Sequence, residues 1–354
     1  MRFAEQGIPA FAVSSNFLGF STKHCRAGIS SLTITPLQVA RRKYVRSPRV
    51  EVHKEPIRAE GSFTETIKRA VENEFAGKNV SRVLNSFHDA MQGRELDVGK
   101  GTPRHQMATS FIEGLDAVPF YDDFTSNDSQ LRWVEHLEQN WEVIANELKA
   151  VTSQKDIQTR GNNIWVPPVV EDAMSYGPDW RTLVLQDREW DPINMKLFPE
   201  TVKILRDETA DVPSVEAFFA KQAPNTGIKL HTDYCNFILT MHLALSAPRD
   251  MSWIEVGGER RYWENGKGLV FNTSFFHQTM NESEDQERHV LLIRFWHPEL
   301  SEVERKALSF LFTIIENPAT HPATLKAASQ LREEAQSRQT KRRKSNARGR
   351  GFAK

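Results

Sequence analysis

The fold is decided by two stretches, HTDYCNFILTMHLAL at residues 231–245 and RHVLLIRFWHP at residues 288–298. In the first, two sets of residues alternate from 237 to 245, and a period of two predicts a strand. Thr240 and His242 belong to the set that is expected to face a cavity. The second stretch is almost continuously apolar and predicts a largely buried strand. The set expected to face packed core is Phe237, Leu239, Met241, Leu243 and Leu245.

Further short strands with turn signals surround these two. We expect strands at Ser214–Lys221 and Gly268–Asn272, and a hairpin at Trp253–Trp263 that turns at Gly257 and Gly258. This succession predicts a mainly β fold, a double-stranded β-helix of the jelly-roll or cupin-like kind, in which two sheets hold a site between them.

Helices are expected on both sides of the β fold. Two amphipathic stretches ahead of it predict an N-terminal helical hairpin, which either docks a partner or packs onto the domain. The strongest helical pattern is expected to back one sheet, and a capping box at Ser301–Glu304 is expected to begin a helix after the last strand. The predicted helices are Ser62–Phe75, Val80–Met91, Ser129–Val151, Ser301 to about Ile315, and Ala323–Ser337.

His231 and Asp233 stand two residues apart. Side chains of an extended strand alternate between faces, so on a strand both would point to one side and could bind one ion. With a second imidazole from a distant segment they would form the two-histidine, one-carboxylate arrangement of non-haem Fe(II) oxygenases. That arrangement leaves positions open for a bidentate cosubstrate and O₂. A His-x-Asp pair also arises by chance, with the histidine as a satisfied surface or core residue.

Arg288 begins the second decisive stretch. A planar, always-charged guanidinium on a buried strand requires a carboxylate partner, and the far carboxylate of 2-oxoglutarate would supply one. Arg294 lies on the same face of the strand, about 20 Å further along. We therefore expect Arg294 near the strand end with an acidic partner of its own.

Several motifs follow one another in an order that is far more specific than any of them alone. They give residues from roughly 110 to 310 a resemblance to the aspartyl/asparaginyl β-hydroxylase family of Fe(II)/2-oxoglutarate dioxygenases. The motifs are Asn140-Trp141-Glu142, Asp179-Trp180-Arg181-Thr182-Leu183, Leu197-Phe198-Pro199-Glu200-Thr201, His231-Thr232-Asp233, Met241-His242-Leu243, Trp263-Glu264-Asn265-Gly266-Lys267, Phe275-Phe276-His277, Arg288 and Trp296-His297-Pro298-Glu299-Leu300.

The resemblance implies roles for six residues. The iron ligands would be His231, Asp233 and His277, so the chain is similar to the branch of the family with a full triad, whereas the animal enzyme lacks the carboxylate. Arg288 would anchor the distal carboxylate of 2-oxoglutarate, and His242 would lie in the same pocket. Thr240 stands where the animal enzymes place an arginine toward the cosubstrate.

Composition limits the remaining possibilities. A chain of 354 residues that is 39% hydrophobic can bury a full core in one large or two modest domains. It contains no run of eighteen apolar residues that would span a membrane, and its two cysteines, Cys25 and Cys235, provide no disulfide framework. The net charge of zero conceals a split, because residues 1–50 and 338–354 hold sixteen of the 46 Lys and Arg but one of the 46 acidic residues.

The chain is expected to divide into four segments. Residues 1–50 have the composition of an organelle transit peptide, with a plastid favoured over a mitochondrion, or of a disordered basic arm. Residues 51–109 are expected to be a helical N-terminal segment and residues 110–317 the jelly-roll dioxygenase domain. Residues 318–354 are expected to form a helix and, from Lys341, a basic disordered tail. That tail either binds nucleic acid or another acidic surface, or is simply solvated.

Three functions are compatible with these patterns. The first is a dioxygenase that uses Fe(2+), 2-oxoglutarate and O2 to hydroxylate an unactivated carbon of an Asp, Asn or other residue in a peptide or protein. The second is the same chemistry on a small molecule or acyl chain. The third is a catalytically silent binding module that acts through the helical hairpin and the basic tail, and the complete triad argues against it.

Overall fold

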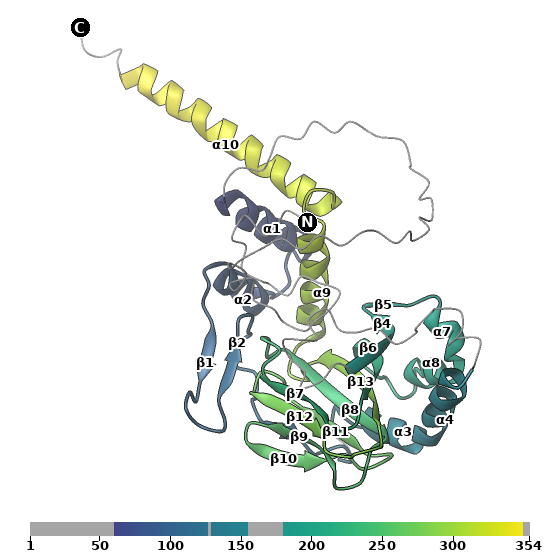
Figure 1. The fold of residues 1–354 in the computed structure, drawn as a ribbon. Helices are drawn as coiled ribbons and strands as arrows, with labels where there is room; N and C mark the ends of the chain where they lie inside the picture. The colour runs from purple at the N-terminus through teal and green to yellow at the C-terminus, as the bar shows by residue number, and fades with distance from the viewer. Residues whose placement is uncertain (1–59, 127–128, 155–179, 350–354) are drawn as a thin grey trace, which may run out of the picture.

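The structure is a computed structural model that describes residues 60–126, 129–154 and 180–349 (Figure 1). The predicted transit peptide at residues 1–50 lies outside these residues. Two β-sheets face each other in the centre, and helices lie beside one sheet and at one end of the barrel (Figure 1).

The larger sheet has seven strands in the order β3-β11-β8-β13-β6-β4-β5, and its neighbouring strands are antiparallel. The smaller sheet has four antiparallel strands in the order β10-β9-β12-β7. This arrangement is the predicted double-stranded β-helix. The strands of the larger sheet are β3 (Phe120–Tyr121), β4 (Trp180–Asp187), β5 (Glu189–Trp190), β6 (Ser214–Gln222), β8 (Ile238–Ser246), β11 (Gly268–Phe271) and β13 (Arg288–Trp296), and those of the smaller are β7 (Thr226–His231), β9 (Ser252–Val256), β10 (Glu259–Tyr262) and β12 (His277–Asn281).

The alternation along β8 separates two layers of core, as predicted. Leu239, Met241 and Leu243 pack with helices against the outer face of the larger sheet. On the inner face, Ala244 packs with Val290 of β13 and with residues of the smaller sheet. Thr240 and His242 share this inner face, so they point into the space between the sheets.

The predicted helix at Ser129–Val151 is two helices, α3 (Trp133–Gln139) and α4 (Trp141–Thr152). The break falls at Asn140, whose side-chain amide donates to the carbonyl of His136 at 2.8 Å. Asparagine competes with the helical backbone in this way and thereby ends helices. Both helices nevertheless back the larger sheet as expected, together with α8 (Pro199–Leu205), which follows the short α7 (Asn194–Leu197).

The N-terminal helices α1 (Glu60–Glu74) and α2 (Ser81–Met91) pack against the C-terminal helices α9 (Glu302–Glu316) and α10 (Pro322–Gly349) (Figure 1). Their apolar residues form one cluster that also includes Phe237 and Ile238 at the start of β8. The apolar face of the predicted hairpin is therefore used for packing onto the rest of the chain. Helix α1 begins at Glu60, two residues before the predicted start at Ser62.

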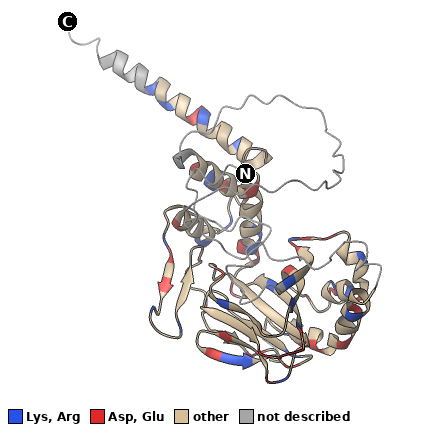
Figure 2. Ribbon diagram, viewed as in Figure 1, with Lys and Arg blue, Asp and Glu red and all other residues tan. Residues whose placement is uncertain are grey.

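Two segments differ from the sequence-based expectation. The segment 51–109, expected to be helical, also contains an antiparallel ribbon of β1 (Leu96–Val98) and β2 (Gln106–Ala108). Helix α10 continues to Gly349, past the point where a disordered tail was expected, because Arg, Lys, Gln and Ala are good helix formers. Across the described helices, none combines the length and apolar character needed to cross a membrane. Acidic and basic residues are interspersed along the described helices and strands (Figure 2).

Candidate metal centre

His231 and His277 lie directly opposite each other on the paired strands β7 and β12. Opposite residues of antiparallel strands place their side chains on the same face. The two imidazole rings are 4.1 Å apart between centroids and inclined by 48°. Two residues separated by 46 positions in the chain are therefore brought together by strand pairing alone.

The orientation of each imidazole is fixed by the backbone. Nδ1 of His231 donates to the carbonyl of Lys229 at 2.7 Å, and Nδ1 of His277 donates to the carbonyl of Phe275 at 2.9 Å. A carbonyl oxygen can only accept, so the proton lies on Nδ1 in both rings and the Nε2 lone pairs remain available. Such a bond at the far nitrogen is the usual support of a metal-binding histidine.

Asp233 completes the group, although not in the way the sequence suggested. Strand β7 ends at His231, so Asp233 lies just after the strand, and the next residue, Tyr234, has a φ of 60°. The two side chains do point to one side, as predicted, but Asp233 does so from outside the strand. The backbone N–H of Asp233 instead donates to the carbonyl of Thr273 at 2.9 Å, which holds the turn against the segment before β12.

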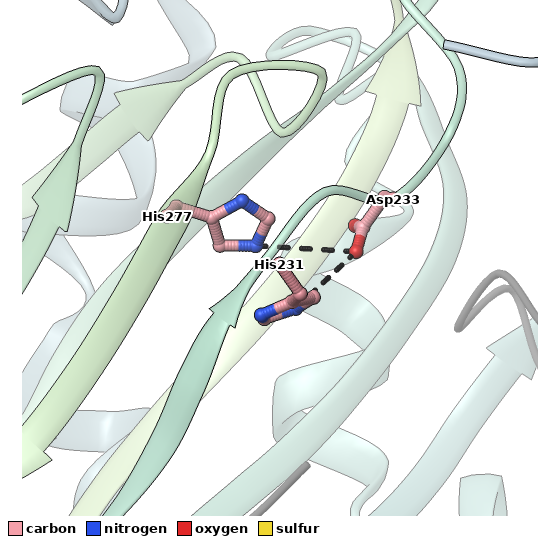
Figure 3. A group of neighbouring side chains, drawn as sticks. All are labelled: His231, Asp233 and His277. Carbon is pink, nitrogen blue, oxygen red and sulfur yellow. Dashed lines mark ion pairs between the residues drawn. The ribbon is translucent and has the colours of Figure 1, made fainter. Parts of the chain in front are cut away.

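The three side chains converge on a common point (Figure 3). Oδ1 of Asp233 lies 3.7 Å from Nε2 of His231 and 3.9 Å from Nε2 of His277. One ligand atom from each residue falls within 4.8 Å of the others, close enough for one ion to be shared. Two imidazoles and one carboxylate form a donor set that suits Fe(II) with positions left open.

Electrostatics keep both imidazoles neutral. Burial and, to a smaller extent, the neighbouring His277 lower the pKa of His231 to about 4 against the opposing effect of Asp233. Burial also lowers the pKa of His277. A metal binds the neutral imidazole, so the environment prepares both rings for ligation near neutral pH.

Arg288 lies on the inner face of β13 and is 1% exposed. Its guanidinium carbon is 4.2 Å from the centre of the Trp263 ring. Its Nε and Nη1 have no hydrogen-bond partner among the described residues. Burial without an anion lowers the pKa of Arg288 to about 9. A buried cation with unused donors is costly, so the site fits a ligand that supplies negative charge.

His242 lies between the candidate metal ligands and Arg288. Its ring stacks on Trp263 at 5.8 Å and meets Phe271 edge-on at 4.9 Å, and Phe271 is 6.3 Å from His277. Burial, Arg288 and His277 together lower the pKa of His242 well below its ordinary value. Thr240 is buried two residues before His242, and its hydroxyl has no partner in the described part of the chain.

Two buried charged residues beside the group were not identified as site residues from the sequence. Nη2 of Arg294 lies 3.3 Å from Oδ2 of Asp233. Arg294 was expected to have an acidic partner, but Asp233 had been assigned to metal binding alone. Glu216 lies opposite Arg294 in the pairing of β6 with β13. The sequence signal that could have identified Arg294 and Glu216 is a charged residue at an inward-facing position of a buried strand.

Comparison with known proteins places this geometry in a family. The family model for aspartyl/asparaginyl beta-hydroxylase matches residues 138–298. Mouse aspartyl/asparaginyl beta-hydroxylase is 26% identical over 269 residues, which cover 71% of this chain and 35% of that protein. Human aspartate beta-hydroxylase domain-containing protein 2 is 28% identical over 227 residues, which cover 62% of this chain and 58% of that protein. The matched regions thus cover about a third to three fifths of these relatives.

Among solved structures, the chain is similar to a prolyl-4-hydroxylase from Pseudomonas putida at 13% identity and a TM-score of 0.27, over 43% of this chain and 87% of that chain. It is similar to a Cupin 2 conserved barrel domain protein from Salinispora arenicola at 13% identity and a TM-score of 0.24, over 41% of this chain and 96% of that chain. The segment that carries the paired sheets, the triad and Arg288, residues 138–298, belongs to the aspartyl/asparaginyl β-hydroxylase family.

Proposed function

We propose that this chain is an Fe(II)/2-oxoglutarate-dependent dioxygenase that hydroxylates an unactivated carbon, with a residue of a peptide or protein as its substrate. The observation that carries the proposal is Arg288, a fully buried guanidinium with unused donors, which acts electrostatically on the same buried His242 as the metal-ligand candidate His277. Membership of a hydroxylase family supports the reaction type.

The residues present fit the proposed groups. His231, His277 and Asp233 would hold iron through two Nε2 atoms and Oδ1, the atoms that face one another. Iron with a 2-oxo acid and O₂ supplies the oxidising power that hydroxylation of an unactivated carbon requires. Arg288, whose Nε and Nη1 have no partner among the described residues, would receive the distal carboxylate of 2-oxoglutarate on its planar guanidinium, which can form a two-pronged contact.

The side chains between these two points would orient the cosubstrate and exclude water. Phe271 and Trp263 form an apolar wall along the line from His277 to Arg288. His242 is kept neutral on this wall, and its Nδ1 is buried with no partner within the described chain. His242 and the Thr240 hydroxyl would offer polar contacts near the metal, while Arg288 neutralises the far end.

The test is release of succinate from 2-oxoglutarate by the purified protein with Fe(II). We expect wild-type turnover that depends on added iron, and loss of turnover in His231→Ala. The matched control is His321→Ala, because His321 lies between α9 and α10, away from the sheets. A wild-type protein that neither turns over 2-oxoglutarate nor binds it would overturn the proposal and leave the silent binding module.

The substrate class is tested separately. Products from peptide pools and from metabolite pools, treated with the active protein and with His231→Ala, would be compared by mass spectrometry. A gain of one oxygen confined to peptides supports the proposal, whereas a gain confined to small molecules would identify the alternative hydroxylase.

A further inference from the structure

The two oxygens of the Asp233 carboxylate face different groups. Its Oδ1 faces the Nε2 atoms of His231 and His277, and its Oδ2 faces Nη2 of Arg294 at 3.3 Å. The side chains of Asp233 and Arg294 are 7% and 4% exposed, so this pair is shielded from water and from salt.

Arg294 is held more rigidly than the residue it contacts. It lies on β13, which is paired on both sides, opposite Glu216 of β6 and opposite Thr240 of β8. Asp233, in contrast, follows the end of β7 and is not part of a strand. We therefore take Arg294 on β13 as the fixed residue of the pair, and Asp233 as the residue whose position depends on it.

The positive charge of Arg294 is favoured by nearby carboxyl groups. Burial opposes its charge, but Asp233 and Glu216 outweigh that effect and raise the pKa of Arg294. Glu216 is 7% exposed, and its Oε1 has no hydrogen-bond partner among the residues that the structure covers. Asp233 is thus the carboxylate that pairs with Arg294, and Glu216 acts on the same guanidinium through its charge from the neighbouring strand.

We infer that Arg294 is a positioning residue that restricts Asp233 to one oxygen at the metal. The inference rests on the proposed function. With Oδ2 engaged by Arg294, Asp233 offers Oδ1 alone, because a carboxylate that chelates through both oxygens would have to turn away from the guanidinium. The coordination position that bidentate binding would fill then stays available beside the chelating cosubstrate.

Metal affinity alone does not test this role. Removing Arg294 takes away a cation that repels the metal, which raises metal affinity, but it also removes the contact that holds the Asp233 carboxylate in position, which lowers metal affinity. The number of open positions is the specific readout. Nitric oxide occupies the position open to O₂, and its complex with Fe(II) gives an electron paramagnetic resonance signal that can be quantified without turnover.

The experiment adds nitric oxide, without oxygen, to protein loaded with Fe(II) and 2-oxoglutarate. Arg294→Gln removes the charge, Arg294→Lys keeps it without the planar fork, and Arg82→Met is the control, since it removes another arginine–carboxylate pair far from the triad. We expect the signal per bound iron in Arg294→Gln to fall below about half of the wild-type value, Arg294→Lys to be intermediate, and Arg82→Met to match wild type.

A wild-type signal intensity and line shape in Arg294→Gln would overturn the inference while leaving the proposed function intact. If circular dichroism shows that Arg294→Gln does not fold, Arg294→Lys provides the test. A signal per bound iron in Arg294→Lys equal to that of wild type would also overturn the inference. A wild-type protein that binds neither iron nor 2-oxoglutarate would instead remove the proposed function and this inference together.

Discussion

Arg288 and Arg294 lie on the same face of one strand but have opposite surroundings. Arg294 forms an ion pair with Asp233, whereas Arg288 rests on the face of Trp263 and is charged without an anion beside it. Because a buried charge without a counter-charge is unfavourable, Arg288 is the one that awaits a ligand. Side chains of one type are thus assigned different tasks by their neighbours.

Arg288→Lys tests the ligand assigned to this side chain. An ammonium is a compact point charge and cannot form the two-pronged contact, so we expect the concentration of 2-oxoglutarate needed for half-maximal succinate release to rise by about tenfold or more. Iron affinity should change little, because Arg288 is not among the converging ligands. Arg82→Lys is the control, and an unchanged 2-oxoglutarate requirement in Arg288→Lys would remove Arg288 from the role.

The sequence predicted the identity of the site residues better than it predicted the structural elements that bring them together. His231 and His277 were proposed from motif and resemblance, and the structure brings them together through the pairing of β7 with β12. The position of Asp233 was derived from a strand that ends two residues earlier. Its partner Arg294 could not be found from local periodicity, because the contact joins a turn to a strand 61 residues away.

At the scale of elements, the strands were easier to predict than the breaks and ribbons. β13 and the β9–β10 hairpin agree with the pattern, since a period of two and a Gly-Gly turn are local signals. The end of α3 at Asn140 depends on a side-chain hydrogen bond. The β1–β2 ribbon depends on the pairing of two strands. Such features have weak local signals, and β1 is too short to show alternation.

The β9–β10 turn is held against the loop that follows β1. Gly258 has a φ of 79°, and a Cβ placed there would lie 2.4 Å from Cβ of Pro103. Gly101 has a φ of 81° but nothing within 4 Å of its Cβ position. We expect Gly101→Ala to cost about 1 kcal/mol in the free energy of unfolding from backbone strain alone, and Gly258→Ala to cost about 1–3 kcal/mol more from the clash.

Urea denaturation of both variants measures the difference. Equal losses in Gly258→Ala and Gly101→Ala would show that Pro103 is not packed against the turn, and the contact between the loop and the smaller sheet would have to be abandoned.

In the whole molecule, the helices that precede the barrel in the sequence and the helices that follow it pack together into one helical unit. Arg82 of α2 forks onto Glu304 of α9 through bonds of 2.7 and 2.9 Å, and Glu304 also caps its own helix through Ser301. Arg69 of α1 pairs with Glu334 of α10 in the same unit. The unit joins the segments before and after the sheets, so its stability is expected to contribute to that of the barrel.

This arrangement predicts a pH dependence of stability. The hydrogen bond from Arg82 lowers the pKa of Glu304 from 4.5 to about 2. A carboxyl group whose pKa is lowered by folding stabilises the folded state above its unfolded pKa, and that contribution disappears as the pH falls from 4.5 toward 2. Because Arg82 is about one third exposed, solvent screening limits the contribution to the order of 1–2 kcal/mol.

Chemical denaturation of wild type and Arg82→Met between pH 7 and pH 3 tests this point. The gap between their free energies of unfolding should be widest near neutral pH and should narrow below pH 4.5. A gap that stays constant over this range would mean that Glu304 does not depend on Arg82 for its ionised state.

The central claim, that the triad and Arg288 together form one metal and cosubstrate site, is tested most directly by a crystal structure of the protein grown without oxygen in the presence of Fe(II) and 2-oxoglutarate. We expect one iron ion bound by Nε2 of His231, Nε2 of His277 and a single oxygen of Asp233, with the distal carboxylate of 2-oxoglutarate on Arg288. Iron bound at other residues, or 2-oxoglutarate placed away from Arg288, would contradict it.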